Sequence, residues 1–145
     1  MKKVLSALMM YLLFSCSEST TNNNVEVLEK WENGVVKKDR VRLAADTFIV
    51  NHYHQNYKLH ISGKAFYIEG EEIKHGTWIA HYPNGGKWSL NNFDRGVENG
   101  EYKTWFKNGV LNLSGQYSQG SAIGKWVFYD TTGVVVKSFD VTPQN

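Results

Sequence analysis

The chain has 145 residues, of which 21% are charged and 14% are aromatic. Its 16 lysines and arginines exceed its 14 acidic residues by two, and the early pair Lys2 and Lys3 supplies that excess. The rest of the chain is therefore formally neutral, which argues against a nucleic-acid-binding stripe or a polybasic lipid-binding patch. Because Cys16 is the only cysteine, the chain can form neither an internal disulfide nor a thiolate metal site.

The N-terminus has the order of a cleavable export signal. Two lysines precede the apolar run Val4–Phe14, which is too short for a membrane span of about 20 apolar residues. The quartet Leu13-Phe14-Ser15-Cys16 resembles the lipobox of bacterial lipoproteins, in which the cysteine receives a lipid and becomes the first mature residue. We therefore predict a signal peptide at 1–15, a lipid on Cys16 and a disordered polar tether over 16–24. This anchor predicts a location in the cell envelope, outside the cytoplasm.

A sequence repeat occupies the second half of the chain. Three segments, 76–85, 100–109 and 124–133, each begin with glycine and start 24 residues apart without a gap. The aligned aromatic positions hold Trp78, Tyr102 and Trp126 in one column and His81, Trp105 and Tyr129 in another. We predict regular repeats over 63–145 and degenerate copies over 25–62, because a fixed period of this kind is typical of repeat architectures.

The local chemistry of each repeat predicts a β-hairpin. Aromatic and β-branched residues alternate with polar ones, which suits a half-buried strand. The dipeptides Asn84-Gly85 and Asn108-Gly109 favour the positive φ angles of tight hairpin turns. Hairpins cannot bury an apolar face alone, so they should add edge to edge. The prediction is a mainly β fold, an antiparallel meander, in which only 39–46 would permit a short helical turn.

This pattern, Gly-x-aromatic-x-x-aromatic-aromatic-x-Asn-Gly with an aromatic-x-x-Gly return, resembles the MORN-repeat variant of bacterial YwqK-like proteins. The resemblance covers 63–141 well and 25–62 poorly. It implies arrays of β-hairpins that bind rather than react. Such proteins are often labelled putative antitoxins, so the resemblance also raises an immunity-like role against an exported toxin.

Titratable residues do not form a convincing catalytic or metal site. His52, His54 and His60 have strand parity for one face, but no second cluster at ligand spacing supports them. The acidic residues group in two stretches, 69–72 and 94–98, which we interpret as solvated turn charges. No nucleophile elbow or phosphate-binding loop is present. We predict a protein that is not an enzyme and uses no metal or cofactor.

The recurring aromatic residues have the most functional potential. They either form the core or leave one row exposed to a ligand. The candidate ligand-facing residues are Trp78, Trp88, Tyr102, Trp105, Trp126 and Tyr129. Our first hypothesis is a lipid-anchored module that mediates protein–protein interaction at the envelope. The alternative is peptidoglycan or carbohydrate binding by exposed rings.

Overall fold

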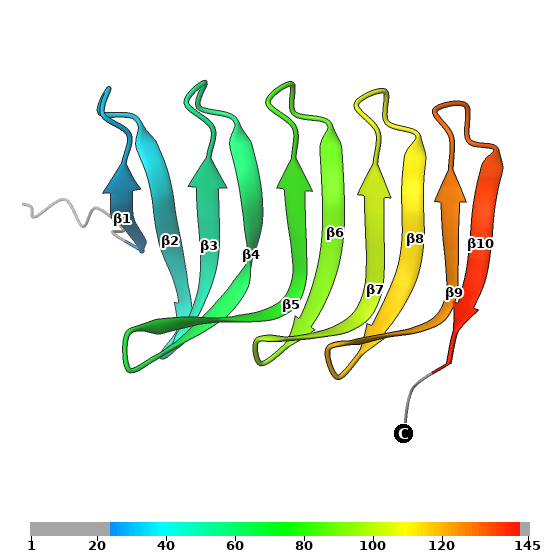
Figure 1. Ribbon diagram of the computed structural model, residues 1–145. Helices are drawn as coiled ribbons and strands as arrows, with labels where there is room; N and C mark the ends of the chain where they lie inside the picture. The colour runs from blue at the N-terminus through cyan, green and yellow to red at the C-terminus, as the bar shows by residue number, and fades with distance from the viewer. Residues whose placement is uncertain (1–23, 143–145) are drawn as a thin grey trace, which may run out of the picture.

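A computed structural model describes residues 24–142, which form one antiparallel sheet of ten strands (Figure 1). The strands are β1 (Val25–Lys30), β2 (Val36–Ala44), β3 (Thr47–Tyr53), β4 (Leu59–Ile68), β5 (Glu71–His81), β6 (Lys87–Asp94), β7 (Val97–Trp105), β8 (Leu111–Ser118), β9 (Ser121–Tyr129) and β10 (Val135–Val141). Each strand pairs with its neighbours in sequence, which confirms the predicted all-β meander. The predicted signal peptide, Cys16 and all but the last residue of the tether lie outside the described residues.

The stretch 39–46, the only place where the sequence would permit a helical turn, forms no helix. Asp39 to Ala44 belong to β2, and only Ala45 and Asp46 form the turn to β3. Because β2 pairs with β1 on one side and β3 on the other, the sheet satisfies its backbone groups, as with Val41 opposite both Val25 and Ile49. Within residues 24–142, no helix is long and apolar enough to cross a membrane.

Five turns at the upper edge of the sheet share one hydrogen-bond pattern (Figure 1). In the β5–β6 turn, Tyr82 N–H donates to the Gly86 carbonyl and Gly85 N–H donates to the Tyr82 carbonyl, both at 2.8 Å. The equivalent turns begin at Trp31, His54, Tyr82, Phe106 and Asp130. Only the fourth residue has a positive φ, so Asn84 does not adopt the predicted left-handed conformation. Its side-chain oxygen instead accepts the Gly86 N–H at 3.0 Å.

Three of the two-residue turns at the lower edge have left-handed backbone geometry. Both central residues have positive φ at Glu69-Gly70, Arg95-Gly96 and Gln119-Gly120, which defines two-residue turns of type I′. Two of these turns also contact the preceding hairpin. The Gly96 N–H donates to the Lys74 carbonyl at 2.7 Å, and the Gly120 N–H donates to the Glu98 carbonyl at 2.8 Å. These bonds hold successive hairpins side by side at the lower edge.

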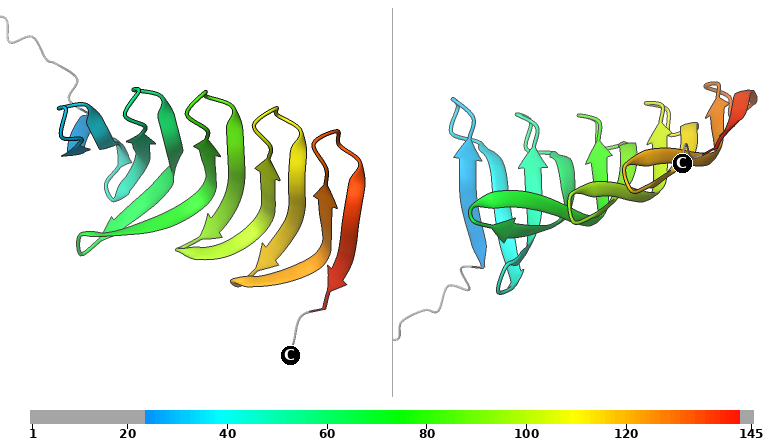
Figure 2. Two further views of the ribbon diagram at one scale, coloured as in Figure 1. Left: turned by 45° about the horizontal axis from the view of Figure 1, so that its top comes forward. Right: turned by 60° about the horizontal axis from the view of Figure 1, so that its bottom comes forward.

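Three hairpins bend sharply where a glycine with positive φ interrupts the register. Gly76, Gly100 and Gly124 lie at these bends, beside irregularities in the pairing of β5, β7 and β9. Figure 2 shows the lower arms of these hairpins swept to one side of the sheet. Glu72 on β5 consequently reaches Lys38 on β2, three strands away. We call the side enclosed by the bend the concave face and the other side the convex face.

The core lies inside this bend, on the concave face. Trp78, 2% exposed, packs with Phe48, Val50 and Ala65. Its indole lies directly over Gly63 in the neighbouring strand, and its Nε1–H donates to the Lys64 carbonyl at 2.9 Å. A second cluster repeats this arrangement, with Trp126 over Gly115 and the rings of Tyr102 and Tyr117 against it. A thin single sheet thus obtains a core by folding over itself.

Candidate functional site

A groove on the concave face is the candidate functional site, and we call it the central groove. It has a volume of about 300 Å³ and crosses strands β4 to β8. Its lining residues are Ile61, Lys74, Trp78, Trp88, Ser89, Asn91, Phe93, Glu98, Tyr102, Thr104 and Tyr117. Aromatic rings and hydrogen-bonding side chains are therefore mixed along one surface.

Strand register explains why these side chains meet. Asn91 of β6 pairs with Trp78 of β5 and with Tyr102 of β7, so all three lie on the same face. Ser89 and Thr104 pair in the same way two residues away. Trp88 is the extra residue at the register shift where β6 meets the end of β5. Its indole remains 46% exposed at the mouth of the groove.

A polar pair lies among the rings of the groove. Asn91 Nδ2 donates to Glu98 Oε1 at 2.9 Å. The other amide atom, Asn91 Oδ1, is buried and accepts no hydrogen bond from the residues that the structure describes. Burial, and then the nearby Glu98 carboxylate, raise the pKa of Tyr102 and of Tyr117. Glu98 is therefore part of the groove. The interpretation of Glu98 as a solvated turn charge, made from the sequence, is wrong.

The six predicted ligand-facing aromatic residues separate into three groups. Trp78, Trp88 and Tyr102 line the central groove, although Trp78 is buried beneath it. Trp126, 7% exposed, lies against Tyr102 with a distance of 5.8 Å between ring centroids. Trp105 and Tyr129 are three residues after Tyr102 and Trp126 on the same strands, and the extra residues at the nearby register shifts belong to β8 and β10. Side chains alternate along β7 and β9, so Trp105 and Tyr129 lie on the convex face. Of this set, only Trp88 is strongly exposed at the groove.

The three predicted histidines lie near one another, at the end of β3 and the start of β4. His60 is the extra residue at the register shift beside Ile61, which pairs with His52, and its ring lies 4.4 Å from that of His54. His60 also lies nearly parallel to the indole of Trp88. Burial lowers the pKa of His52, His60 and His81, which favours their neutral forms. Within residues 24–142, no three His, Cys, Asp or Glu side chains gather in a metal-binding arrangement.

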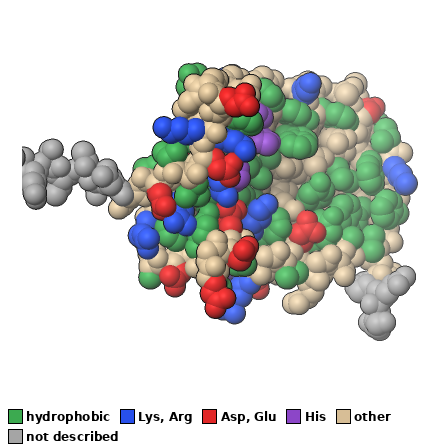
Figure 3. Space-filling model, turned by 60° about the vertical axis from the view of Figure 1, so that its left-hand side comes forward, with side chains coloured by type: hydrophobic (Ala, Val, Ile, Leu, Met, Phe, Trp, Pro, Cys, Tyr) green, Lys and Arg blue, Asp and Glu red, His purple; other side chains and the backbone are tan. Residues whose placement is uncertain are grey.

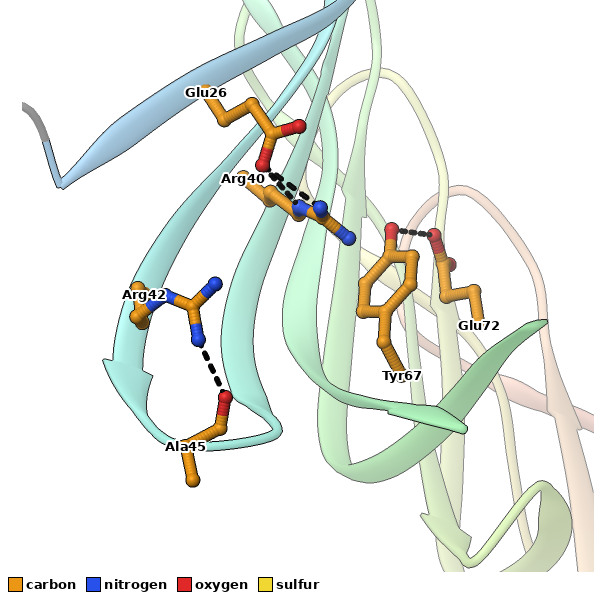
Figure 4. Close-up of polar contacts among 6 residues, drawn as sticks. All are labelled: Glu26, Arg40, Arg42, Ala45, Tyr67 and Glu72. Carbon is orange, nitrogen blue, oxygen red and sulfur yellow. Dashed lines mark hydrogen bonds and ion pairs between the residues drawn. The ribbon is translucent and has the colours of Figure 1, made fainter. Parts of the chain in front are cut away.

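A charged cluster occupies the N-terminal part of the concave face (Figure 4). Arg40 pairs with Glu26, Nη2 to Oε2, at 2.7 Å, and its guanidinium lies over the rings of Phe48 and Tyr67 at 4.6 and 4.3 Å. The Tyr67 hydroxyl donates to Glu72 Oε2 at 2.9 Å. Arg40 therefore contributes in two ways: its guanidinium forms an ion pair with Glu26 and packs on two aromatic rings.

Glu72 is the sheltered acid of this cluster, although the sequence suggested a solvated turn charge. Its Oε2 lies 2.8 Å from Lys38 Nζ, with the two side chains only 18% and 17% exposed. Burial by itself would raise the pKa of Glu72, but hydrogen bonds from Lys38 and Tyr67 and the Lys38 charge outweigh burial and hold the pKa below its ordinary value of 4.5. The folded state thus favours the ionised carboxylate.

This lowered pKa predicts acid sensitivity. The stabilisation by Glu72 should be fully present above pH 4.5 and lost as the pH falls through the folded-state pKa. We expect Glu72→Gln to lower the free energy of unfolding by about 1–3 kcal/mol at pH 7 and by clearly less at pH 3. Urea titrations at both pH values measure the difference. Glu71→Gln is the matched control, because Glu71 is exposed. An equal loss for Glu72→Gln at both pH values would contradict the assignment.

The fold and groove define a class: an open, bent, single-sheet β protein with a small ligand-sized groove on its concave face. No protein-family model, curated protein or solved structure matches this chain.

Proposed function

We propose that this protein is a lipid-anchored, non-catalytic interaction module that holds a protein partner at the cell envelope. The observation that carries the proposal is the edge strand β10. It pairs only with β9 among the described residues, and most of its side chains are exposed. An edge strand of this kind presents main-chain donors and acceptors to an incoming strand.

The exposed apolar side chains of β10 make this edge suitable for contact with another protein. Val135 and Val136 are 53% and 62% exposed, and Phe139 also remains accessible. Natural proteins usually protect such an edge with charges, and repeat arrays usually end in a polar cap. β10 has two charged residues, Lys137 and Asp140, but the Lys137 ammonium lies over the rings of Phe128 and Phe139 at 5.8 and 5.2 Å. Figure 3, seen from the β1 side, shows charged side chains over the N-terminal strands and hydrophobic ones farther from them. At the other edge, the exposed Val135, Val136 and Phe139 give β10 the chemistry of a contact surface.

The opposite edge of the sheet is different. β1 has exposed valines too, but its Glu29 pairs with Lys37 at 2.8 Å and its Glu26 pairs with Arg40. These charges oppose strand addition at β1. The occupant that fits β10 is thus an extended, partly apolar segment of a partner protein, bound as an eleventh strand.

The sequence supports the anchoring part of this proposal. The lipobox-like quartet ending at Cys16 would attach the chain to a bacterial membrane, and the polar stretch 16–24 would separate the sheet from it. We also infer a relationship to MORN-type repeat proteins. The five equivalent upper turns support that inference, because the same hydrogen bonds recur along the sheet. An immunity-like role against an exported toxin would use the same edge.

The test is site-directed crosslinking in cells. We expect a photo-crosslinker at Ser138 of β10 to capture one protein in near-equal amount, and Val136→Lys to reduce that yield at least tenfold. Lysine at an edge strand disfavours pairing. Val27→Lys on β1 is the matched control and should leave the yield unchanged. Equal yields from wild type and Val136→Lys would contradict the proposal, and capture of a second copy of this chain would replace the partner with a dimer.

A further inference from the structure

The central groove has the size and composition of a site for a small ligand. Its volume of about 300 Å³ lies at the lower end of the range of ligand pockets, about 300–1,000 Å³. It combines rings with a few convergent polar groups, which is typical of such pockets. The groove is separate from the β10 edge, since it is lined by residues of β4 to β8. A ligand bound in the groove would therefore be additional to the protein partner proposed for β10.

Trp88 supplies an accessible flat surface at the mouth of the groove. It is the extra residue at a bulge, which turns its side chain toward Ser89 and the concave face. The imidazole of His60 lies nearly parallel to it, with an interplanar angle of 7° and 6.3 Å between centroids. The indole is 46% exposed, although most other rings of this face are half-buried or buried. An exposed, positioned indole suits a ligand with a flat apolar face.

Asn91 supplies a hydrogen-bond acceptor inside the groove. A carboxylate only accepts hydrogen bonds, so the amide must present its Nδ2 to Glu98 Oε1, at 2.9 Å. This arrangement directs Oδ1 elsewhere, where it is buried and accepts no hydrogen bond from residues 24–142. A buried acceptor without a donor is unfavourable. A hydroxyl or amide N–H of a ligand would satisfy it.

The charges of the groove restrict the ligand further. The groove contains one carboxylate, on Glu98, and one ammonium, on Lys74, which lies over the rings of Trp78 and Phe93 at 4.7 and 5.1 Å. Because the two charges balance, a phosphate or a carboxylate gains no net attraction. The site therefore offers donors and acceptors without a net charge. A neutral ligand rich in hydroxyl groups, with an apolar face, matches both the polar groups and the indole.

We propose that the central groove binds a carbohydrate, with a pyranose ring stacked on Trp88 and a hydroxyl or acetamido N–H donated to Asn91 Oδ1. The axial C–H groups of a pyranose form the apolar face that packs on an indole. Its equatorial hydroxyls point sideways, toward groups placed as Asn91, Glu98 and Thr104 are. A protein in the cell envelope has such sugars within reach as wall glycans.

The test uses the full chain in detergent micelles, probed with insoluble peptidoglycan and with an array of neutral oligosaccharides that includes the N-acetylglucosamine trimer. We expect saturable binding to at least one of these probes. Trp88→Ala should weaken that binding about tenfold, and Asn91→Leu should weaken it by a similar factor. Tyr57→Gly is the control, because Tyr57 is an exposed ring at an upper turn outside the groove. Circular dichroism melting curves verify that each variant is folded.

The outcomes separate this inference from the proposed function. Val136→Lys should leave glycan binding unchanged while it removes the crosslinked protein. If Asn91→Leu fails to fold, Trp88→Ala still decides, since its side chain is largely outside the core. Absence of binding to every probe by the folded wild-type chain would overturn the inference, as would binding that survives Trp88→Ala.

Discussion

Replacing Trp78 by alanine is expected to lower the free energy of unfolding by about 3–5 kcal/mol. The indole is 2% exposed and contacts the buried side chains that unite β3, β4 and β5. Its removal would also leave the Lys64 carbonyl without the Nε1–H donor at 2.9 Å. Urea unfolding followed by circular dichroism measures the change.

Trp88→Ala is the matched control for this prediction. It removes the same side chain from the neighbouring strand, but at a position 46% exposed. We expect a loss below about 1 kcal/mol, because mainly surface contacts disappear. Comparable losses for the two variants would contradict the division between a core tryptophan and a groove tryptophan.

Gly63→Ala should be the second most damaging substitution, with an expected loss of about 1–3 kcal/mol or more. A Cβ at Gly63 would lie 2.3 Å from Cδ2 of the Trp78 indole, far inside contact distance. The indole cannot move away easily, since it is enclosed by the bend. Thermal or urea unfolding of the variant measures the loss.

The control and a double mutant make this prediction specific. Gly86→Ala, at a glycine that also lacks a positive φ, would meet only the flexible Asn84 side chain at 3.3 Å and should cost little. In a Trp78→Ala background, Gly63→Ala should lose most of its effect, because the clashing ring is gone. Strict additivity of the two substitutions would show that the cost has another origin. Gly115 under Trp126 offers an independent copy of the same contact.

Much of the fold follows from local patterns in the sequence. Alternation of aromatic and polar residues, together with glycine near the ends of strands, correctly indicated an antiparallel meander. The assignment of turn type was less successful. Asn84 and Asn108 act through their side chains in the upper turns, while the lower turns use Glu69, Arg95 and Gln119 at positive φ. Tyr57 takes a place that glycine occupies in the equivalent turns, which concealed that turn in the sequence.

The groove was harder to predict. Trp88 and Tyr102 were candidates because they are aromatic, but Asn91 and Glu98 belong to different strands and become partners only across a bulge. The environment of Glu72 could not be predicted for the same reason, since its partner Lys38 lies three strands away in the sheet. Strand alternation gives the parity of a side chain within one strand. It does not reveal which hairpin folds over which.

The amino-acid sequence alone specifies the strands, their antiparallel order and the positions of the turns. These features depend on backbone preferences and on contacts between neighbours in the chain. The tertiary structure decided which aromatic rings are buried, which acids are sheltered and where a groove opens. These features arise from the bends at Gly76, Gly100 and Gly124, which fold the lower arms over the concave face. A bend of this kind brings together side chains from non-adjacent strands, and no local pattern specifies that meeting.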